Sequence, residues 1–240
     1  SGDAIVLAIG NNSPYFQAYR WSSLTGFGAM YANPSTLFSA NGMSFSFHPD
    51  GDAIALGTNG SPSVNAYSWS SSAGFGSRYA SPATSPGSAV LVAEFSPSGN
   101  AVVFAGGIGS PYVAAYAWSS ASGFGTKYNN ATPSTPDQPQ GGSFSPSGNA
   151  VAIAHKGTPF IAAYGWSSAS GFSAKYADPA TLATLNTAAY GYEVKFSPAG
   201  DVIALVFGET PYVIAYAWSS ASGFGTKYSN PGTLPAGSSR

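Results

Sequence analysis

Few side chains in this sequence are suited to catalysis or metal binding, and they are scattered along it. The 240 residues include 2 His, 9 Asp plus Glu, 8 Lys plus Arg and no Cys. Without Cys, disulfides, thiolate metal sites and cysteine nucleophiles are excluded. His48 falls in a predicted hairpin turn and His155 at the end of a predicted strand, so we expect no symmetric metal site and a structural role for each.

The carboxylates form no clear catalytic pattern. Three of them share one turn position with two Asn residues, and both residue types cap such turns well: Asp3, Asp52, Asp201, Asn100 and Asn149. Glu94, Glu193 and Lys195 are expected on innermost strands, where we interpret them as an ion contact and keep paired catalytic carboxylates as the alternative. No Gly-x-Ser-x-Gly elbow follows a strand and precedes a helix. We predict no catalytic residue, no metal and no cofactor, and a protein that is not an enzyme.

Binding residues are better sought where copies of an internal repeat differ from one another. The loops after the second and fourth strands of each copy vary, and variable loops on a rigid scaffold commonly carry function. An aromatic column borders these loops at the start of the third strand, suited to glycan or peptide contact or to packing beneath the loops. The candidate binding residues are Asn11, Asn12, Tyr15, Tyr112, His155, Lys156, Phe160, Tyr190, Glu209 and Tyr212.

The repeat is defined by its aromatic residues. All five Trp lie in one column, spaced 48, 49, 48 and 52 residues apart: Trp21, Trp69, Trp118, Trp166 and Trp218. A Tyr precedes each Trp by two residues, a Phe follows six residues later, and a second Tyr comes four residues after that Phe. Five copies, starting near residues 1, 50, 98, 147 and 199, are therefore present, and we treat residues 1–240 as one domain.

Each copy is predicted to form four short strands, with no apolar pattern of helical period. A Phe-Ser-Pro-Ser-Gly-Asn turn, as in residues 95–100, joins the first strand to an apolar second strand such as 101–105 or 202–207. The fourth strand begins at a Gly-Phe segment. The third strand is predicted to run to the Trp from a Pro: Pro14, Pro62, Pro111, Pro159 or Pro211.

The third strand indicates how copies pack together. In residues 112–118, alternation places Tyr112, Tyr116 and Trp118 on one face and only Val and Ala on the other. The bulky face of one unit can fill the shallow face of the next, as propeller blades require. We predict an all-β fold, a five-bladed β-propeller of four-stranded antiparallel blades.

Only four first strands can be counted, in residues 43–47, 90–95, 141–144 and 192–196. We therefore expect one blade, built from residues near the N-terminus, to lack its innermost strand, and the termini to lie close together. Two alternatives are that the chain is cut from a longer array, or that a neighbouring chain supplies the strand.

The charge of the chain argues against several classes of partner. Only 7% of the residues are charged and the net charge is -1, which gives no basis for binding nucleic acid or a membrane surface. Basic residues form one column on the fourth strands, interpreted as protection of an outer sheet edge: Arg78, Lys127, Lys175 and Lys227. No apolar run is long enough to cross a bilayer. We expect a soluble monomer.

The motifs resemble known repeats. The segment Val92-Ala-Glu-Phe-Ser-Pro-Ser-Gly, then an apolar strand and a later Tyr-x-Trp, resembles the tryptophan-aspartate and YVTN-type propeller repeats in all five copies. Ser replaces the Asp that follows Trp in the first family, so its hydrogen-bond network is not carried over. The fuller pattern also resembles repeat proteins of unassigned function from bacteriophages and aquatic microbial sequences. That resemblance implies a virion or cell-surface module without a defined activity.

The leading interpretation is a non-enzymatic structural or interaction module that binds a protein or a glycan through its variable loops. One alternative is a propeller lectin with several repeat-related sites. Another is an engineered or recently amplified scaffold with no evolved ligand. A hydrolase with a channel site is a further alternative.

Overall fold

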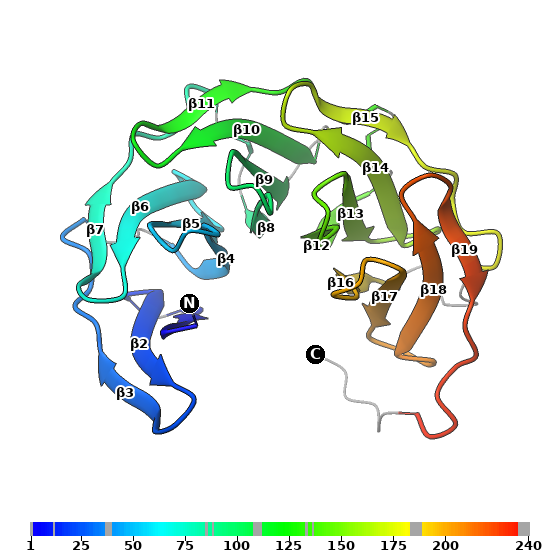
Figure 1. Cartoon of the computed structure of the whole chain (residues 1–240), viewed down its shortest axis with the longest axis horizontal. Helices are drawn as coiled ribbons and strands as arrows, with labels where there is room; N and C mark the ends of the chain where they lie inside the picture. Colours follow the sequence, from blue (N-terminus) through cyan, green and yellow to red (C-terminus); the bar gives the residue numbers. More distant parts are fainter. Residues whose placement is uncertain are drawn as a thin grey trace. The chain divides into compact units, whose positions relative to one another are not determined.

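The computed structural model describes residues 2–11, 13–36, 40–84, 86–87, 89–107, 112–132, 134–135, 137–182 and 189–234. Throughout these residues the secondary structure is β, in five antiparallel sheets (Figure 1). No helix in the described part is long and apolar enough to cross a membrane. The chain forms two compact units, unit 1 (Ser1–Ile108 with Tyr116–Lys127) and unit 2 (Gly109–Ala115 with Tyr128–Arg240). The division between the units falls inside one strand, between Ala115 and Tyr116. That residues 1–240 form a single domain therefore stays a prediction.

Every sheet is a meander whose strands pair in chain order. The first has three strands, β1 (Ala4–Ala8), β2 (Phe16–Ser22) and β3 (Gly26–Met30). For the residues that the structure describes, this confirms the prediction of a blade near the N-terminus without its innermost strand. The other sheets have four strands: β4 (Gly42–Phe47), β5 (Ala53–Thr58), β6 (Val64–Ser70), β7 (Gly74–Arg78); β8 (Val90–Phe95), β9 (Ala101–Gly106), β10 (Val113–Ser119), β11 (Gly123–Lys127); β12 (Pro139–Phe144), β13 (Ala150–His155), β14 (Ile161–Ser167), β15 (Gly171–Lys175); β16 (Gly191–Phe196), β17 (Val202–Phe207), β18 (Val213–Ser219) and β19 (Gly223–Lys227).

The turn between the first and second strands is the predicted hairpin. Between β8 and β9, the Ser96 amide donates to the carbonyl of Ala101 at 2.9 Å, and the Gly99 amide donates to the carbonyl of Ser96 at 2.8 Å. Gly99 has a φ of 71°, which Gly adopts without steric cost. The Ser98 hydroxyl donates to Asn100 Oδ1 at 2.7 Å, which explains why Asn or Asp occupies this position.

The predicted start of the third strand is wrong by two residues. The strand starts at Phe16 in the first sheet and at Ile161 in the fourth, after the Pro and the residue that follows it. The intervening residue has a positive φ at Tyr15 (63°), Phe160 (68°) and Tyr212 (62°), so it belongs to a turn and leaves the strand direction.

The bulky face of a third strand packs on the shallow face of the preceding sheet, as predicted, at β6 in unit 1 and at β18 in unit 2. In unit 1, Tyr67 and Trp69 of β6 form one buried cluster with Val6 and Ala18 of the first sheet. In unit 2, Tyr216 and Trp218 of β18 pack with the alanines of β13. Aromatic rings placed over alanines fill the space between sheets at close packing, which stabilises each pair of sheets.

The fourth strand is an outer edge in every sheet, as predicted. In the four-stranded sheets its basic residue lies opposite the Tyr of the third strand in the antiparallel register, as in the pairs Tyr116 with Lys127 and Tyr164 with Lys175, whereas Met30 has this place in the first sheet. A Lys at an edge disfavours pairing with the edge of another sheet, because its charge would have to be desolvated.

Candidate functional site

Three side chains of unit 2 form a stack at the variable loops between β13 and β14 and before β16. The Lys156 ammonium lies 5.3 Å from the centroid of the Tyr190 ring. The Tyr190 and Tyr192 rings are parallel within 10°, with centroids 5.8 Å apart. All three residues are half-buried, so part of each is open to solvent. We call Lys156, Tyr190 and Tyr192 the stacked cluster.

Backbone contacts hold the stacked cluster in place. Lys156 and Tyr190 form an antiparallel β-bridge, and the Lys156 amide donates to the carbonyl of Gln138 at 3.1 Å. Gly191 lies between the two tyrosines, and a Cβ there would come within 2.6 Å of the Phe160 carbonyl oxygen. A Cβ on Gly208 would lie 2.7 Å from the Tyr192 ring. The two glycines therefore allow the close approach that brings these loops together.

His155 precedes Lys156 in the chain, and the Phe160 carbonyl lies against Gly191; both side chains are buried, at 0% and 1% exposure. The His155 Nδ1 lies 2.8 Å from the Lys156 carbonyl oxygen, while Nε2 has no hydrogen-bond partner among the described residues. Burial lowers the pKa of His155, while the backbone groups of Lys156 and Ile161 act in the opposite direction and raise it. A neutral imidazole that donates from Nδ1 to the Lys156 carbonyl therefore holds the backbone at Lys156 in place. Phe160 packs edge-on against Phe207, with ring centroids 5.7 Å apart.

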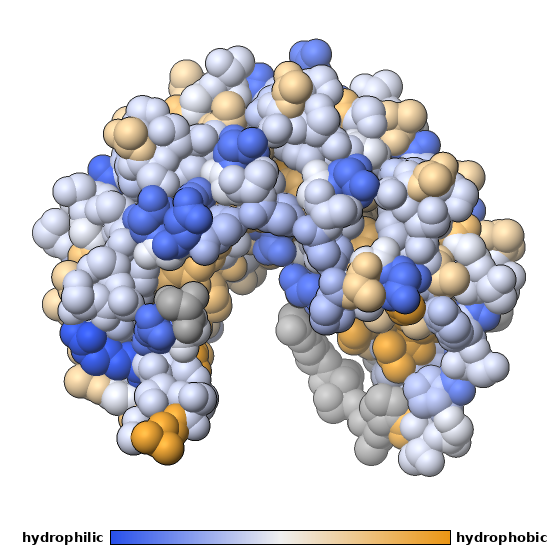
Figure 2. All heavy atoms as spheres, viewed as in Figure 1, coloured by the Kyte–Doolittle hydropathy of each residue, from blue (hydrophilic) through white to orange (hydrophobic). Residues whose placement is uncertain are grey.

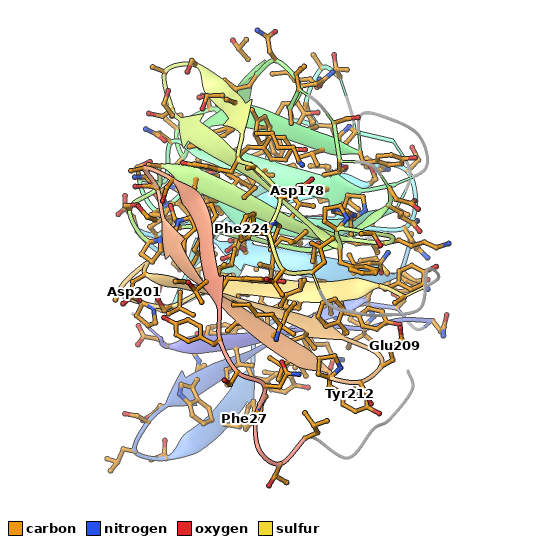
Figure 3. All side chains as sticks on the ribbon, turned by 90° about the vertical axis from the view of Figure 1, so that its right-hand side faces the viewer. Phe27, Asp178, Asp201, Glu209, Tyr212 and Phe224 are labelled. Atoms are coloured by element: carbon orange, nitrogen blue, oxygen red, sulfur yellow. The ribbon has the colours of Figure 1, made fainter. Side chains whose placement is uncertain are left out.

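Glu209 and Tyr212 lie in the loop between β17 and β18. The Tyr212 amide donates to the Glu209 carbonyl at 2.7 Å, which closes the loop. Figure 3 shows both side chains at one end of this sheet, with Asp201 of the hairpin turn at the opposite end. Variable loops and uniform turns therefore occupy opposite ends of the sheet, as the sequence predicts.

The remaining candidates do not join the stacked cluster. Asn11 and Tyr15 belong to unit 1, where the amide of Asn11 donates to Asn41 Oδ1 at 3.0 Å. Tyr112 precedes β10 and is half-buried. Asn12 lies outside the described residues. Sequence reasoning missed Tyr192, although its spacing of two from Tyr190 predicts that both side chains lie on the same face of a strand.

The charged residues of the innermost strands belong to different units, Glu94 to unit 1 and Glu193 and Lys195 to unit 2. In unit 2, Lys195 Nζ lies 3.9 Å from Glu193 Oε1, and both side chains are about half exposed, at 57% and 49%. This is the ion contact that the sequence predicts. Glu94 lies on β8 in unit 1. No group of three or more potential metal ligands occurs among the described residues.

His48 has a structural role in unit 1, as predicted. Its Nε2 lies 2.9 Å from the Gly99 carbonyl oxygen and its Nδ1 lies 2.7 Å from Asp52 Oδ1, which also accepts from the Ser120 hydroxyl at 2.9 Å. The serine contacts the carboxylate and not the imidazole, so this group lacks the Ser-His geometry that activates a nucleophile. A pocket of about 260 Å³ beside it is lined by Asp3, His48 and Trp69, among others.

Comparison with solved structures finds the same type of sheet arrangement. A protein from Lactobacillus plantarum shares 15% identity with a TM-score of 0.68, over 88% of this chain and 64% of that chain. A candidate 6-phosphogluconolactonase from Bacteroides fragilis shares 14% identity with a TM-score of 0.70, over 95% and 67% of the two chains. A candidate 6-phosphogluconolactonase from Bacteroides uniformis shares 14% identity with a TM-score of 0.66, over 94% and 66%.

The chain has a β-propeller-type fold. The neighbours are seven-bladed propellers, and the chain spans about two thirds of their length. No protein-family description and no curated protein matches the sequence. At 14–15% identity these propellers show the fold alone.

The propeller neighbours correct one prediction. We expected a protein that is not an enzyme, yet two of the neighbours are named as candidate 6-phosphogluconolactonases. The prediction rested on the lack of a recognisable catalytic motif, with paired carboxylates on the innermost strands kept as the alternative. Residues from separate strands can instead meet in space and leave no local motif, so a motif search does not exclude an enzyme.

Proposed function

We propose that this chain is a five-bladed propeller domain that binds an anionic sugar or sugar acid at the stacked cluster. The observation that carries the proposal is the parallel pair Tyr190 and Tyr192 with the Lys156 ammonium over the Tyr190 ring. Aromatic rings offer an apolar surface on which the C–H face of a sugar can pack, and their hydroxyls can form hydrogen bonds at its edge. Lys156 adds a charge-assisted donor for a carboxylate or phosphate.

The geometry favours a small ligand over an extended acidic surface. Lys156 is the one basic residue of the stacked cluster, and the chain carries a net charge of -1. A single ammonium suits one anionic group on a small molecule, whereas a polyanion needs many cations. The neighbours named as 6-phosphogluconolactonases support a ligand of this class, since the compound in their name is a phosphorylated sugar lactone.

Titration calorimetry with gluconate and 6-phosphogluconate, together with a glycan array, tests this proposal. We expect Lys156→Ala and Tyr192→Ala each to weaken binding by about 10-fold or more, because each removes one side of the contact. Lys175→Ala is the matched control, since Lys175 pairs with Asp178 at a sheet edge of the same unit. Absence of binding to every probe, or equal affinity of wild type and both variants, would refute the proposal.

Hydrolysis of a sugar lactone is the second candidate function, favoured by the exposed pair Glu193 and Lys195 on β16. The Glu193 carboxylate could take a proton from the attacking water while Lys195 faces the anionic group of the substrate. We expect Glu193→Gln to lower hydrolysis of 6-phosphogluconolactone by about 100-fold or more, with Asp178→Asn as the control. A wild-type rate equal to the rate in buffer would eliminate this candidate.

A further inference from the structure

A tyrosine contact between neighbouring sheets recurs four times within the chain. The Tyr that follows each fourth strand packs edge-on against the Trp of the next sheet, at centroid distances of 4.9–5.2 Å. Its hydroxyl donates to a serine carbonyl in the turn after that Trp, at 2.6–2.7 Å. The tyrosines are Tyr31 and Tyr79 in unit 1, and Tyr128 and Tyr176 in unit 2.

A glycine completes each receiving site. A Cβ on the Gly that begins the receiving fourth strand would come within 2.7–3.0 Å of the tyrosine Cβ, at Gly74, Gly123, Gly171 and Gly223. The site therefore consists of this Gly, the Trp at the end of the third strand and the serine carbonyl of the turn between them. We call this set the tyrosine seat.

The first sheet carries a tyrosine seat that no described residue of unit 1 fills. Around Gly26, whose φ of 76° matches the other seats, only the Trp21 ring comes within 4 Å of a Cβ position. Among the described residues, Trp21 packs edge-on only against Phe27 of its own sheet, at 5.1 Å. Phe27 is 62% exposed, as are Leu24 at 91% and Met30 at 50%. Figure 2 shows hydrophobic side chains uncovered at the turn between β2 and β3.

Tyr228 is the matching unseated tyrosine, in unit 2. Its amide donates to the Ala215 carbonyl at 2.9 Å, the same backbone contact that Tyr176 makes with Ala163. The backbone therefore holds Tyr228 as it holds the four seated tyrosines. Its side chain is 49% exposed, and its hydroxyl makes no hydrogen bond with a described residue of unit 2. Val206, on the same sheet, is also 43% exposed.

We propose that the empty seat at Gly26 receives Tyr228 of a second copy of this chain. In each copy, unit 1 carries one seat that unit 1 leaves empty and unit 2 carries one tyrosine that unit 2 leaves unseated, so a contact between copies is heterologous and continues from copy to copy. It would repeat a sheet-to-sheet contact that the chain already makes four times, and it would cover exposed apolar side chains of both sheets. A net charge of -1 gives little repulsion between copies. This replaces the expectation of a monomer.

Sedimentation velocity over a concentration series tests the proposal. We expect wild type to self-associate, and Tyr228→Ala and Gly26→Ala each to weaken association by at least about 30-fold. The first variant removes the tyrosine, and the second places a Cβ where the filled seats hold the tyrosine Cβ. Tyr228→Phe keeps the ring and loses the hydroxyl, so it should weaken association less. Tyr79→Phe is the matched control, since its hydroxyl bond lies within unit 1.

Mixing the two variants distinguishes the possible occupants. Tyr228→Ala keeps an intact seat and Gly26→Ala keeps an intact tyrosine, so a mixture should form heterodimers and nothing larger. Circular dichroism establishes that each variant is folded. A wild type that is monomeric at every concentration would overturn the proposal. If Tyr228→Ala also lowered the melting temperature of that monomer, the seat would be assigned to Tyr228 of the same chain. Oligomers that neither variant weakens would also overturn it.

Discussion

Gly171→Ala is expected to lower the free energy of unfolding by about 3 kcal/mol. The residue has a φ of 79°, where a Cβ costs about 1 kcal/mol. The new Cβ would also lie 2.7 Å from Tyr128 Cβ, inside contact distance. To relieve this overlap, Tyr128 must leave the Trp166 ring and the Ser168 carbonyl to which its hydroxyl donates. Urea denaturation followed by tryptophan fluorescence measures the loss.

Gly26→Ala is the matched control for this prediction. Gly26 has nearly the same φ, 76°, at the same point of the repeat, but no tyrosine lies within 4 Å of the new Cβ. Measured at a concentration where the chain is monomeric, it should cost only the backbone strain of about 1 kcal/mol. Equal losses in the two variants would mean that the tyrosine seat contributes nothing to stability.

These glycines also indicate why so much of the fold can be predicted from the sequence. The Trp and Tyr columns recur because each copy buries the same bulky face on the same shallow face, so one spacing predicts both the strands and their packing. The turn glycines recur because each needs a positive φ. The three-stranded first sheet follows from counting the strands of each type. All of these features are local, or they repeat with the period of the chain.

The stacked cluster could not be predicted in the same way. It depends on the bridge between Lys156 and Tyr190 and on the absence of a Cβ at Gly208, two features that occur in one copy only where the structure describes the chain. The burial of His155 and Phe160 likewise depends on how Gly191 lets one loop lie against another. A single copy supplies no periodic signal, so a residue such as Tyr192 is recognised only when the strands are placed in space.

The stability of the protein is expected to fall steeply in alkali, between pH 10 and about pH 12. Burial raises the pKa of Tyr116, Tyr164 and Tyr216 to about 12. Two of these hydroxyls donate to backbone carbonyls, Tyr116 to Thr84 and Tyr216 to Thr181, so the neutral form is the one that fits the fold. In the unfolded chain the same groups titrate near pH 10.

The sign follows from counting protons. Below about pH 9 both states hold these protons, so the tyrosines add no pH dependence. Above pH 10 the unfolded chain releases protons that the folded chain retains, and stability is lost until the folded groups titrate near pH 12. Thermal melts across this range, with tyrosinate absorbance recorded alongside, should show the late tyrosines ionising together with unfolding. A variant with Phe at all three positions should keep its melting temperature to a higher pH than wild type. An unchanged pH profile in that variant would mean that these three tyrosines do not cause the alkaline loss.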